Sequence, residues 1–158
     1  MLRKRFEMRR WVPMIAWAAI TLSLASCSND DADLILGEII PTFPGDDVSL
    51  ALSVQPLFTT SCATAGCHSA ASAQSGLVLE EGKLFNPATG IVEVASQQSS
   101  LLRVESFSSD ESYLIHKLEG TQASVGGAGS SMPSGAVALS QEAIQVIRDW
   151  IDQGAQDN

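Results

Sequence analysis

The sequence predicts a small, mostly α-helical domain, and three observations lead to that fold class. Apolar residues recur at helical spacing in segments that begin with Ser or Asp, and two of these segments stop at a glycine. Alternation of apolar and polar residues, which marks half-buried strands, is scarce. The stretches between the helical segments are rich in Gly, Pro and Ser, as loops are. We therefore expect short helices joined by loops around one core.

Residues 1–27 have the pattern of an export signal and are set apart from the fold. Five basic residues flank the start of an apolar stretch, Trp11 to Leu24, which is too short for a comfortable permanent membrane span. The stretch ends in Leu24-Ala25-Ser26-Cys27, which resembles the bacterial lipobox. That resemblance implies that the Cys27 thiol receives a diacylglycerol and that Cys27 becomes the mature N-terminus.

A lipid on Cys27 would hold the protein to the bacterial cell envelope, facing the periplasm. Ser28 follows the cysteine, and under the common sorting rule this favours the outer membrane over the inner one. The alternative is an ordinary cleaved signal peptide or an uncleaved anchor, in which Cys27 has no special role.

Residues 28–47 are rich in Asp and contain two prolines, which predicts an acidic, flexible tether ahead of the domain. From Ser28 onward the chain has four basic and seventeen acidic residues, a net charge of −13. Phosphate binding needs clustered Lys and Arg, so this balance argues against a nucleic-acid partner. A basic or neutral redox protein is a better match.

The domain itself is predicted over residues 48–158. A first helix begins near Ser49, which can cap it, and runs directly into Cys62. Its apolar positions are Leu50, Val54, Leu57 and Phe58. Mixed patterns over residues 76–90 predict loops and brief extended pieces. A second helix starts at Asp110-Glu111-Ser112 and stops at Gly120.

The last predicted helix has the clearest signal in the chain. Ser140 is a suitable N-cap, Glu142 lies favourably in the first turn, and Gly154 ends the helix. The apolar face consists of Ala143, Ile144, Ile147, Trp150 and Ile151. Before this helix, a glycine and serine stretch over residues 126–131 predicts a loop that leads into Met132.

The segment Cys62-Ala63-Thr64-Ala65-Gly66-Cys67-His68 places two thiols and an imidazole close together after a helix. The usual signature for haem attachment is Cys-x-x-Cys-His, in which both thiols bond the haem vinyl groups and the histidine binds iron. Here four residues separate the cysteines, so the loop must bulge to bring both sulfurs to the porphyrin. The pattern predicts one covalent haem c on Cys62 and Cys67, with His68 as an axial ligand.

The two cysteines also allow a different reading. An oxidising compartment permits a Cys62–Cys67 disulfide, which would leave an envelope lipoprotein without haem. A structural zinc site is weaker, because no further cysteine and only one distant histidine could complete four ligands.

Met132 is the predicted second axial ligand, because every other methionine lies in the signal segment. Its thioether is a soft ligand that favours ferrous iron, and Pro133 restrains the loop beside it. The competing ligand is His116, the only other histidine, which would give bis-histidine coordination. If neither binds, the iron keeps an open position, as in an enzyme or sensor for a small gas or peroxide.

Several short motifs occur in a familiar order: Val54-Gln55-Pro56-Leu57-Phe58, the Cys-x4-Cys-His segment, Gly76-Leu77-Val78-Leu79, Ser112-Tyr113-Leu114, Met132-Pro133 and Trp150-Ile151-Asp152-Gln153-Gly154-Ala155. Together they resemble the small monohaem cytochrome c domains of bacterial envelope proteins, including those of the planctomycete type. The resemblance implies a class I cytochrome c fold, short helices around one covalent haem, with Cys62, Cys67, His68 and Met132 in their expected roles. It also implies that Trp150 packs near the haem or the helix crossing. The implied function is single-electron transfer, by a carrier or a subunit of a larger oxidoreductase, rather than catalysis.

Overall fold

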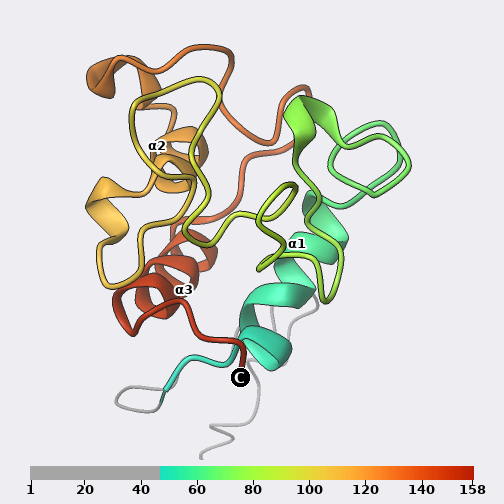
Figure 1. Ribbon diagram of the computed structural model, residues 1–158, viewed down its shortest axis with the longest axis vertical. Coiled ribbons are helices and arrows are strands. Elements are labelled where there is room, and N and C mark those ends of the chain that lie inside the picture. The colour runs from blue at the N-terminus through green and yellow to red at the C-terminus, as the bar shows by residue number, and fades with distance from the viewer. Residues whose placement is uncertain (1–46) are drawn as a thin grey trace, which may run out of the picture. The chain divides into compact units, whose positions relative to one another are not determined.

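A computed structural model of the chain describes residues 47–158 (Figure 1). The predicted signal, the lipidation site at Cys27 and the tether up to residue 46 lie outside the described residues. Helical residues make up 37% of the described part. No helix in this part is long and apolar enough to cross a membrane.

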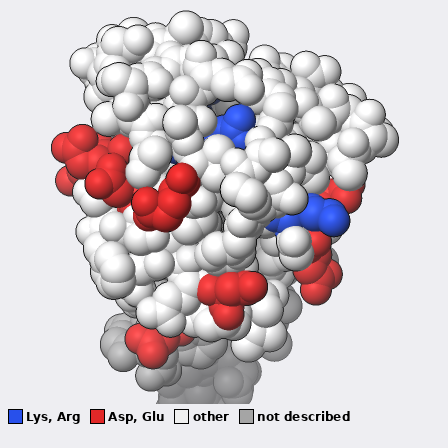
Figure 2. Space-filling model, viewed as in Figure 1, with Lys and Arg blue, Asp and Glu red and all other residues white. Residues whose placement is uncertain are grey.

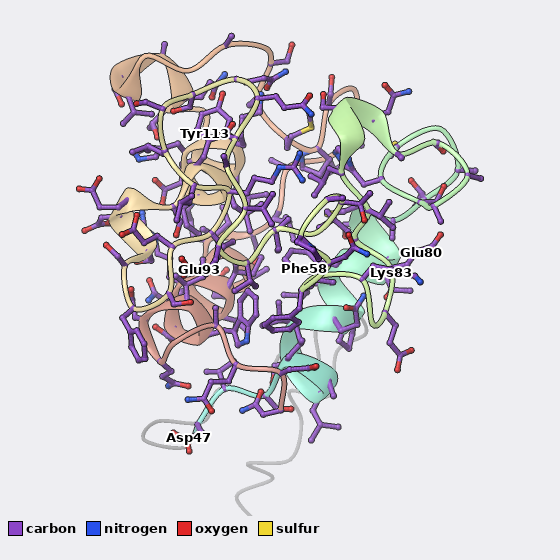
Figure 3. All side chains as sticks on the ribbon, viewed as in Figure 1. Asp47, Phe58, Glu80, Lys83, Glu93 and Tyr113 are labelled. Atoms are coloured by element: carbon purple, nitrogen blue, oxygen red, sulfur yellow. The ribbon has the colours of Figure 1, made fainter. Side chains whose placement is uncertain are left out.

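The first helix starts where the sequence predicts it. Ser49 caps it, with its Oγ accepting from the Leu52 N–H at 3.3 Å. The first turns, Leu50–Val54 (η1), are π-helical and continue into α1, Gln55–Ser61, a change of winding that the apolar spacing does not predict. Phe58 is fully buried and points into the middle of the molecule (Figure 3).

The second predicted helix is also present, as a 3₁₀ turn, Ser109–Glu111 (η3), followed by α2, Tyr113–Glu119. Gly120 ends α2 in the left-handed conformation, at φ 74°, which glycine adopts without a steric penalty. Two further 3₁₀ turns lie in the loops, at Gln74–Gly76 (η2) and Gln122–Val125 (η4).

The last helix, α3, covers Gln141–Asp152, and its predicted cap and apolar face are confirmed. The Ser140 Oγ accepts from the Ala143 N–H at 3.2 Å. α3 packs against η1, η3 and α2. Arg148 joins it to the second helical segment through ion pairs with Asp110 at 2.7 Å and Glu119 at 2.8 Å.

Loops and turns make up most of the rest, as predicted for residues 76–90. In the described part, extended backbone is limited to isolated bridges: Val92 with Val104, Ala95 with Leu102, and Glu105 with Ser108. Gly90 lies so close to the Leu84 and Asn86 carbonyl oxygens that no Cβ would fit there.

One apolar core connects these elements. Its buried members are Leu50, Val54, Phe58, Leu79, Leu84, Ile91, Val104, Ile115, Leu118, Ile144, Val146, Ile147, Trp150, Ile151 and Ala155. We call the first helix (residues 50–61) and α3 the helical base, and residues 62–79 and 120–140 the loop wall. Figure 1 shows α3 and the start of the first helix in the lower half of the view and the loop wall in the upper half. α2 lies between them in this view, so it can carry side chains toward the loop wall.

Candidate cofactor site

A cavity of about 490 Å³ lies between the loop wall, α2 and the loops over residues 90–103. Its volume falls within the range of about 300–1,000 Å³ that is usual for pockets of small ligands and cofactors. Most of the lining is apolar, and the apolar side chains include Leu77, Leu79, Ile91, Leu114 and Leu118. All four residues predicted to hold haem also line it: Cys62, Cys67, His68 and Met132.

The loop that carries the cysteines bulges, as the longer spacing predicts. The His68 N–H donates to the Cys62 carbonyl at 3.1 Å, which closes the loop at its base. Within it, the Cys67 N–H donates to the Thr64 carbonyl at 3.0 Å. Gly66 turns the chain at φ 83°, and its N–H donates to the Ser72 Oγ at 2.8 Å. The extra residues are thus taken up in a turn, and Cys62 stays hydrogen-bonded to the residue that follows Cys67.

Both cysteines of this loop are free thiols in the structure. Cys62 is half-buried and Cys67 is exposed. Burial, with a smaller contribution from the neighbouring Cys67, raises the pKa of the Cys62 thiol to about 11. Cys62 is therefore a neutral thiol at neutral pH.

His68 presents an imidazole with an unused nitrogen. Its Nδ1 is buried and makes no hydrogen bond. Burial lowers the pKa of His68. The nearby backbone groups of Leu77 and Gln74 have the opposite, smaller effect on this pKa. The positive charges of Arg103 and Lys117 lower the pKa further. The ring is thus favoured in the neutral form that binds metals.

Met132 is tied to α2 through the loop that contains it. Its N–H donates to the Lys117 carbonyl at 2.8 Å. Four residues earlier, the Ala128 carbonyl accepts from the Tyr113 hydroxyl at 2.9 Å and from the Lys117 Nζ at 3.2 Å. Met132 itself is half-buried and packs against the core. The glycine-rich loop is therefore anchored at both ends of the segment that leads to Met132.

His116, the competing ligand, points elsewhere. Its Nδ1 is hydrogen-bonded to the Thr121 Oγ1 at 2.9 Å and its Nε2 to the Asp110 carbonyl at 3.0 Å. It does not line the cavity. Both ring nitrogens are thus engaged, which favours Met132 over His116 as the partner of His68.

Trp150 does not line the cavity either. It is buried in the core on α3, the helix that packs against η1, and its Nε1 donates to the Gln156 carbonyl at 2.9 Å. The resemblance implies that Trp150 packs either near the haem or at the helix crossing, and its place in the core corresponds to the second of these.

Sequence reasoning missed the polar side chains on the cavity wall, among them Arg103, Tyr113 and Lys117. Tyr113 and Lys117 are four residues apart on α2, so they share a face, and this spacing is a signal that could have found them. Arg103 lies in a stretch with no clear local pattern. Figure 2 shows basic atoms set back among uncharged side chains in the upper part of the view.

The donor set fits a haem better than a structural zinc ion. Within residues 47–158, no three His, Cys, Asp or Glu side chains come together as a zinc site requires. The cavity instead combines two thiols, one unpartnered imidazole nitrogen and one thioether within apolar walls. Comparison of the chain with models of protein families, with curated proteins and with solved structures gives no match.

Proposed function

We propose that this domain binds one haem c covalently through Cys62 and Cys67, with His68 and Met132 as axial ligands, and transfers single electrons. One observation carries the proposal: these four side chains line the same mostly apolar cavity, although Met132 lies far from the other three in the sequence. A disulfide-bonded domain without a cofactor would need neither a cavity of about 490 Å³ nor a methionine on its wall.

Each residue has a distinct chemical task in this proposal. Cys62 and Cys67 form thioether links that keep the cofactor from dissociating. The neutral His68 ring would supply a nitrogen ligand to the iron, and the Met132 thioether would favour the ferrous state. The bound haem supplies a one-electron couple. Leu79 and Ile91, both buried, help to keep water away from the site.

The proposal makes the protein an electron carrier, or a carrier subunit of a larger oxidoreductase, and not an enzyme. With His68 and Met132 both bound to iron, no position is left for a substrate. Its redox partners would meet it at the bacterial cell envelope, where the lipobox pattern at Cys27 is the support for a lipid anchor. Cys27→Ala should then release the protein from membranes, whereas a wild-type protein that is already soluble would contradict the anchor.

The decisive experiment is haem analysis of the full chain, expressed together with a cytochrome c maturation system. The pyridine haemochrome spectrum of the denatured protein should be that of haem c. Cys62→Ala and Cys67→Ala should each shift the spectrum toward that of a haem with one thioether. A wild-type protein without covalent haem would overturn the proposal.

A matched pair of histidine variants tests the ligand assignment. His68→Gln should abolish the low-spin spectrum, whereas His116→Gln should leave it unchanged, because His116 does not line the cavity. The reduced wild-type protein should not bind carbon monoxide, and Met132→Ala should bind it. Carbon monoxide binding by the wild type would instead favour the sensor or enzyme with an open iron position.

A further inference from the structure

The cavity wall contains two buried positive charges. Arg103 is 8% exposed and Lys117 is 7% exposed, and both line the cavity. They are two of only four basic residues in the described part of the chain, which has twelve acidic ones. Lys and Arg are rarely buried to this degree unless they are paired with an anion.

No carboxylate in the described part pairs with either charge. The ion pairs there are those of Arg148 with Asp110 and Glu119. Arg103 donates only to backbone carbonyls: from Nη1 to Gly90 at 2.6 Å and Gly76 at 3.5 Å, and from Nη2 to Ser75 at 3.3 Å. These neutral partners leave the charge of Arg103 uncompensated.

Lys117 is in the same situation. Its Nζ donates to the Ala128 carbonyl at 3.2 Å and to the Gln98 Oε1 at 3.4 Å, and it lies 5.9 Å from the centre of the Tyr113 ring. An ammonium group has three donors and a guanidinium group five, so both residues keep donors that no protein acceptor uses. Arg103 makes no bond through Nε within the described residues.

The surroundings of the cavity make these charges stand out. Residues 48–79 and 120–141 contain no Asp, Glu, Lys or Arg, and they include the whole loop wall. The acidic groups in Figure 2 lie lower in the view or at its side. An acidic protein thus has a positively charged cavity within an uncharged rim, so the charges match a ligand inside the cavity better than a partner on the surface.

We propose that Arg103 and Lys117 form an anion site that receives two carboxylate groups of the ligand in this cavity. The inference rests on the proposed function, under which these groups are the two propionates of the haem. Charge-assisted hydrogen bonds to the ligand would offset the cost of burying both cations. The same positive charges would raise the reduction potential, because reduction removes one positive charge from the iron.

The direct test uses mesoporphyrin and its dimethyl ester, with the full chain purified without the maturation system. The dicarboxylate should bind about tenfold tighter than the ester, or better, as expected for hydrogen bonds to a charged group. Lys117→Gln and Arg103→Gln should remove that preference, and Lys117→Arg should retain it. Equal binding of the two porphyrins to the wild type would overturn the anion site.

A second measurement uses the protein with covalent haem. Lys117→Gln should lower the reduction potential by several times the shift caused by Lys83→Gln, which removes an exposed charge outside the cavity. Lys117→Arg should keep the reduction potential of the wild type, because it keeps the positive charge. If Lys117 acted only by its hydrogen bonds between loops, the potential would not follow the charge of residue 117. Equal shifts for Lys117→Gln and Lys83→Gln would contradict the proposal.

The two proposals can fail separately. A dicarboxylate preference without a haem c spectrum would overturn covalent attachment and leave the anion site standing. A haem c spectrum without any effect of the Arg103 and Lys117 variants would do the reverse.

Discussion

The helical base and the loop wall are held together by different forces. In the base, α3 buries almost one whole face, and Ile147, Trp150 and Ile151 are each no more than 1% exposed. In the wall, the chain is ordered by backbone hydrogen bonds such as His68 N–H to the Cys62 carbonyl. Two side chains of α2, Tyr113 and Lys117, also hold the wall by donating to the Ala128 carbonyl.

The base and the wall therefore have different roles: the base supplies apolar burial, and the wall lines the cavity. Apolar burial in the base contributes free energy roughly in proportion to area and needs no ligand. The wall buries less apolar area: residues 120–138 include five glycines and no buried residue, and the buried apolar residues of 62–79 are Val78 and Leu79. We infer that buried apolar area in the base supplies most of the stability of the fold, whereas hydrogen bonds hold the wall in place around the cavity.

The largest effect should come from the base. Trp150→Ala removes a buried indole and should lower the free energy of unfolding by about 3–5 kcal/mol. Gln145→Ala, on the exposed face of the same helix, should change it by no more than about 0.5 kcal/mol. Urea unfolding followed by circular dichroism measures both. A similar loss for the two variants would mean that α3 does not anchor the core.

Gly90→Ala should cause the next largest loss in the free energy of unfolding. It should change the cavity more than the helices. A Cβ at this position would meet the Leu84 and Asn86 carbonyls, and the backbone shift should cost about 1–3 kcal/mol. The Gly90 carbonyl would then move away from Arg103, which now donates to it at 2.6 Å. Loss of porphyrin binding with helix content retained would fit this picture.

Gly82→Ala is the matched control for that variant. Gly82 also belongs to a loop and has a positive φ of 70°, but a Cβ there meets nothing within 4 Å. Gly82→Ala should lower the free energy of unfolding by about 1 kcal/mol through backbone strain alone and leave the cavity intact. If the two glycine variants lose binding equally, close packing at Gly90 is not the cause.

A smaller effect is expected where the wall is anchored. Tyr113→Phe keeps the ring but removes the hydroxyl that donates to the Ala128 carbonyl at 2.9 Å. We expect a loss of about 0.5–1.5 kcal/mol, together with faster amide hydrogen exchange over residues 126–132. Exchange in α3 should stay unchanged. Uniform acceleration in both regions would show that base and wall open as one unit.

Sequence patterns were informative where the signal is local. Ser49, Ser140 and Gly120 cap their helices through bonds to residues only a few positions away, and each of these boundaries was predicted. The thiols and the imidazole of residues 62–68 are close together in the chain, so the sequence alone predicts that they share a site. Met132 is predicted as a ligand by elimination, since no other methionine follows the predicted signal, and the structure places it on the cavity wall.

The polar wall of the cavity could not be found in this way. The partners of Arg103 are the carbonyls of Ser75, Gly76 and Gly90. Every residue has a backbone carbonyl, so the residue types do not reveal these partners. Its burial depends on how distant loops pack, which no local pattern encodes. The contacts of Asn158 are equally hidden from local patterns: it accepts from the N–H groups of Leu50 and Ala51, more than a hundred residues earlier in the chain.

The smallest effect should come from Glu93, on an exposed loop outside both regions. Its carboxylate accepts from the Ser106 N–H at 2.8 Å, and this hydrogen bond lowers the pKa of Glu93 below its ordinary value of 4.5. Because the folded pKa is the lower one, the bond stabilises the fold above pH 4.5 and is lost as the pH falls through the folded pKa. Glu93→Gln should therefore be slightly less stable than the wild type at neutral pH and equal to it in acid.

Urea unfolding at neutral and acidic pH would reveal this convergence, and Glu93→Asp, with a carboxylate too short for the same bond, should behave like Glu93→Gln. A constant difference between wild type and variant across this range would mean that the charge of Glu93 does not strengthen its bond to Ser106. The contrast between base and wall would then extend to the surface: loop contacts would contribute geometry, and buried apolar area would contribute the stability.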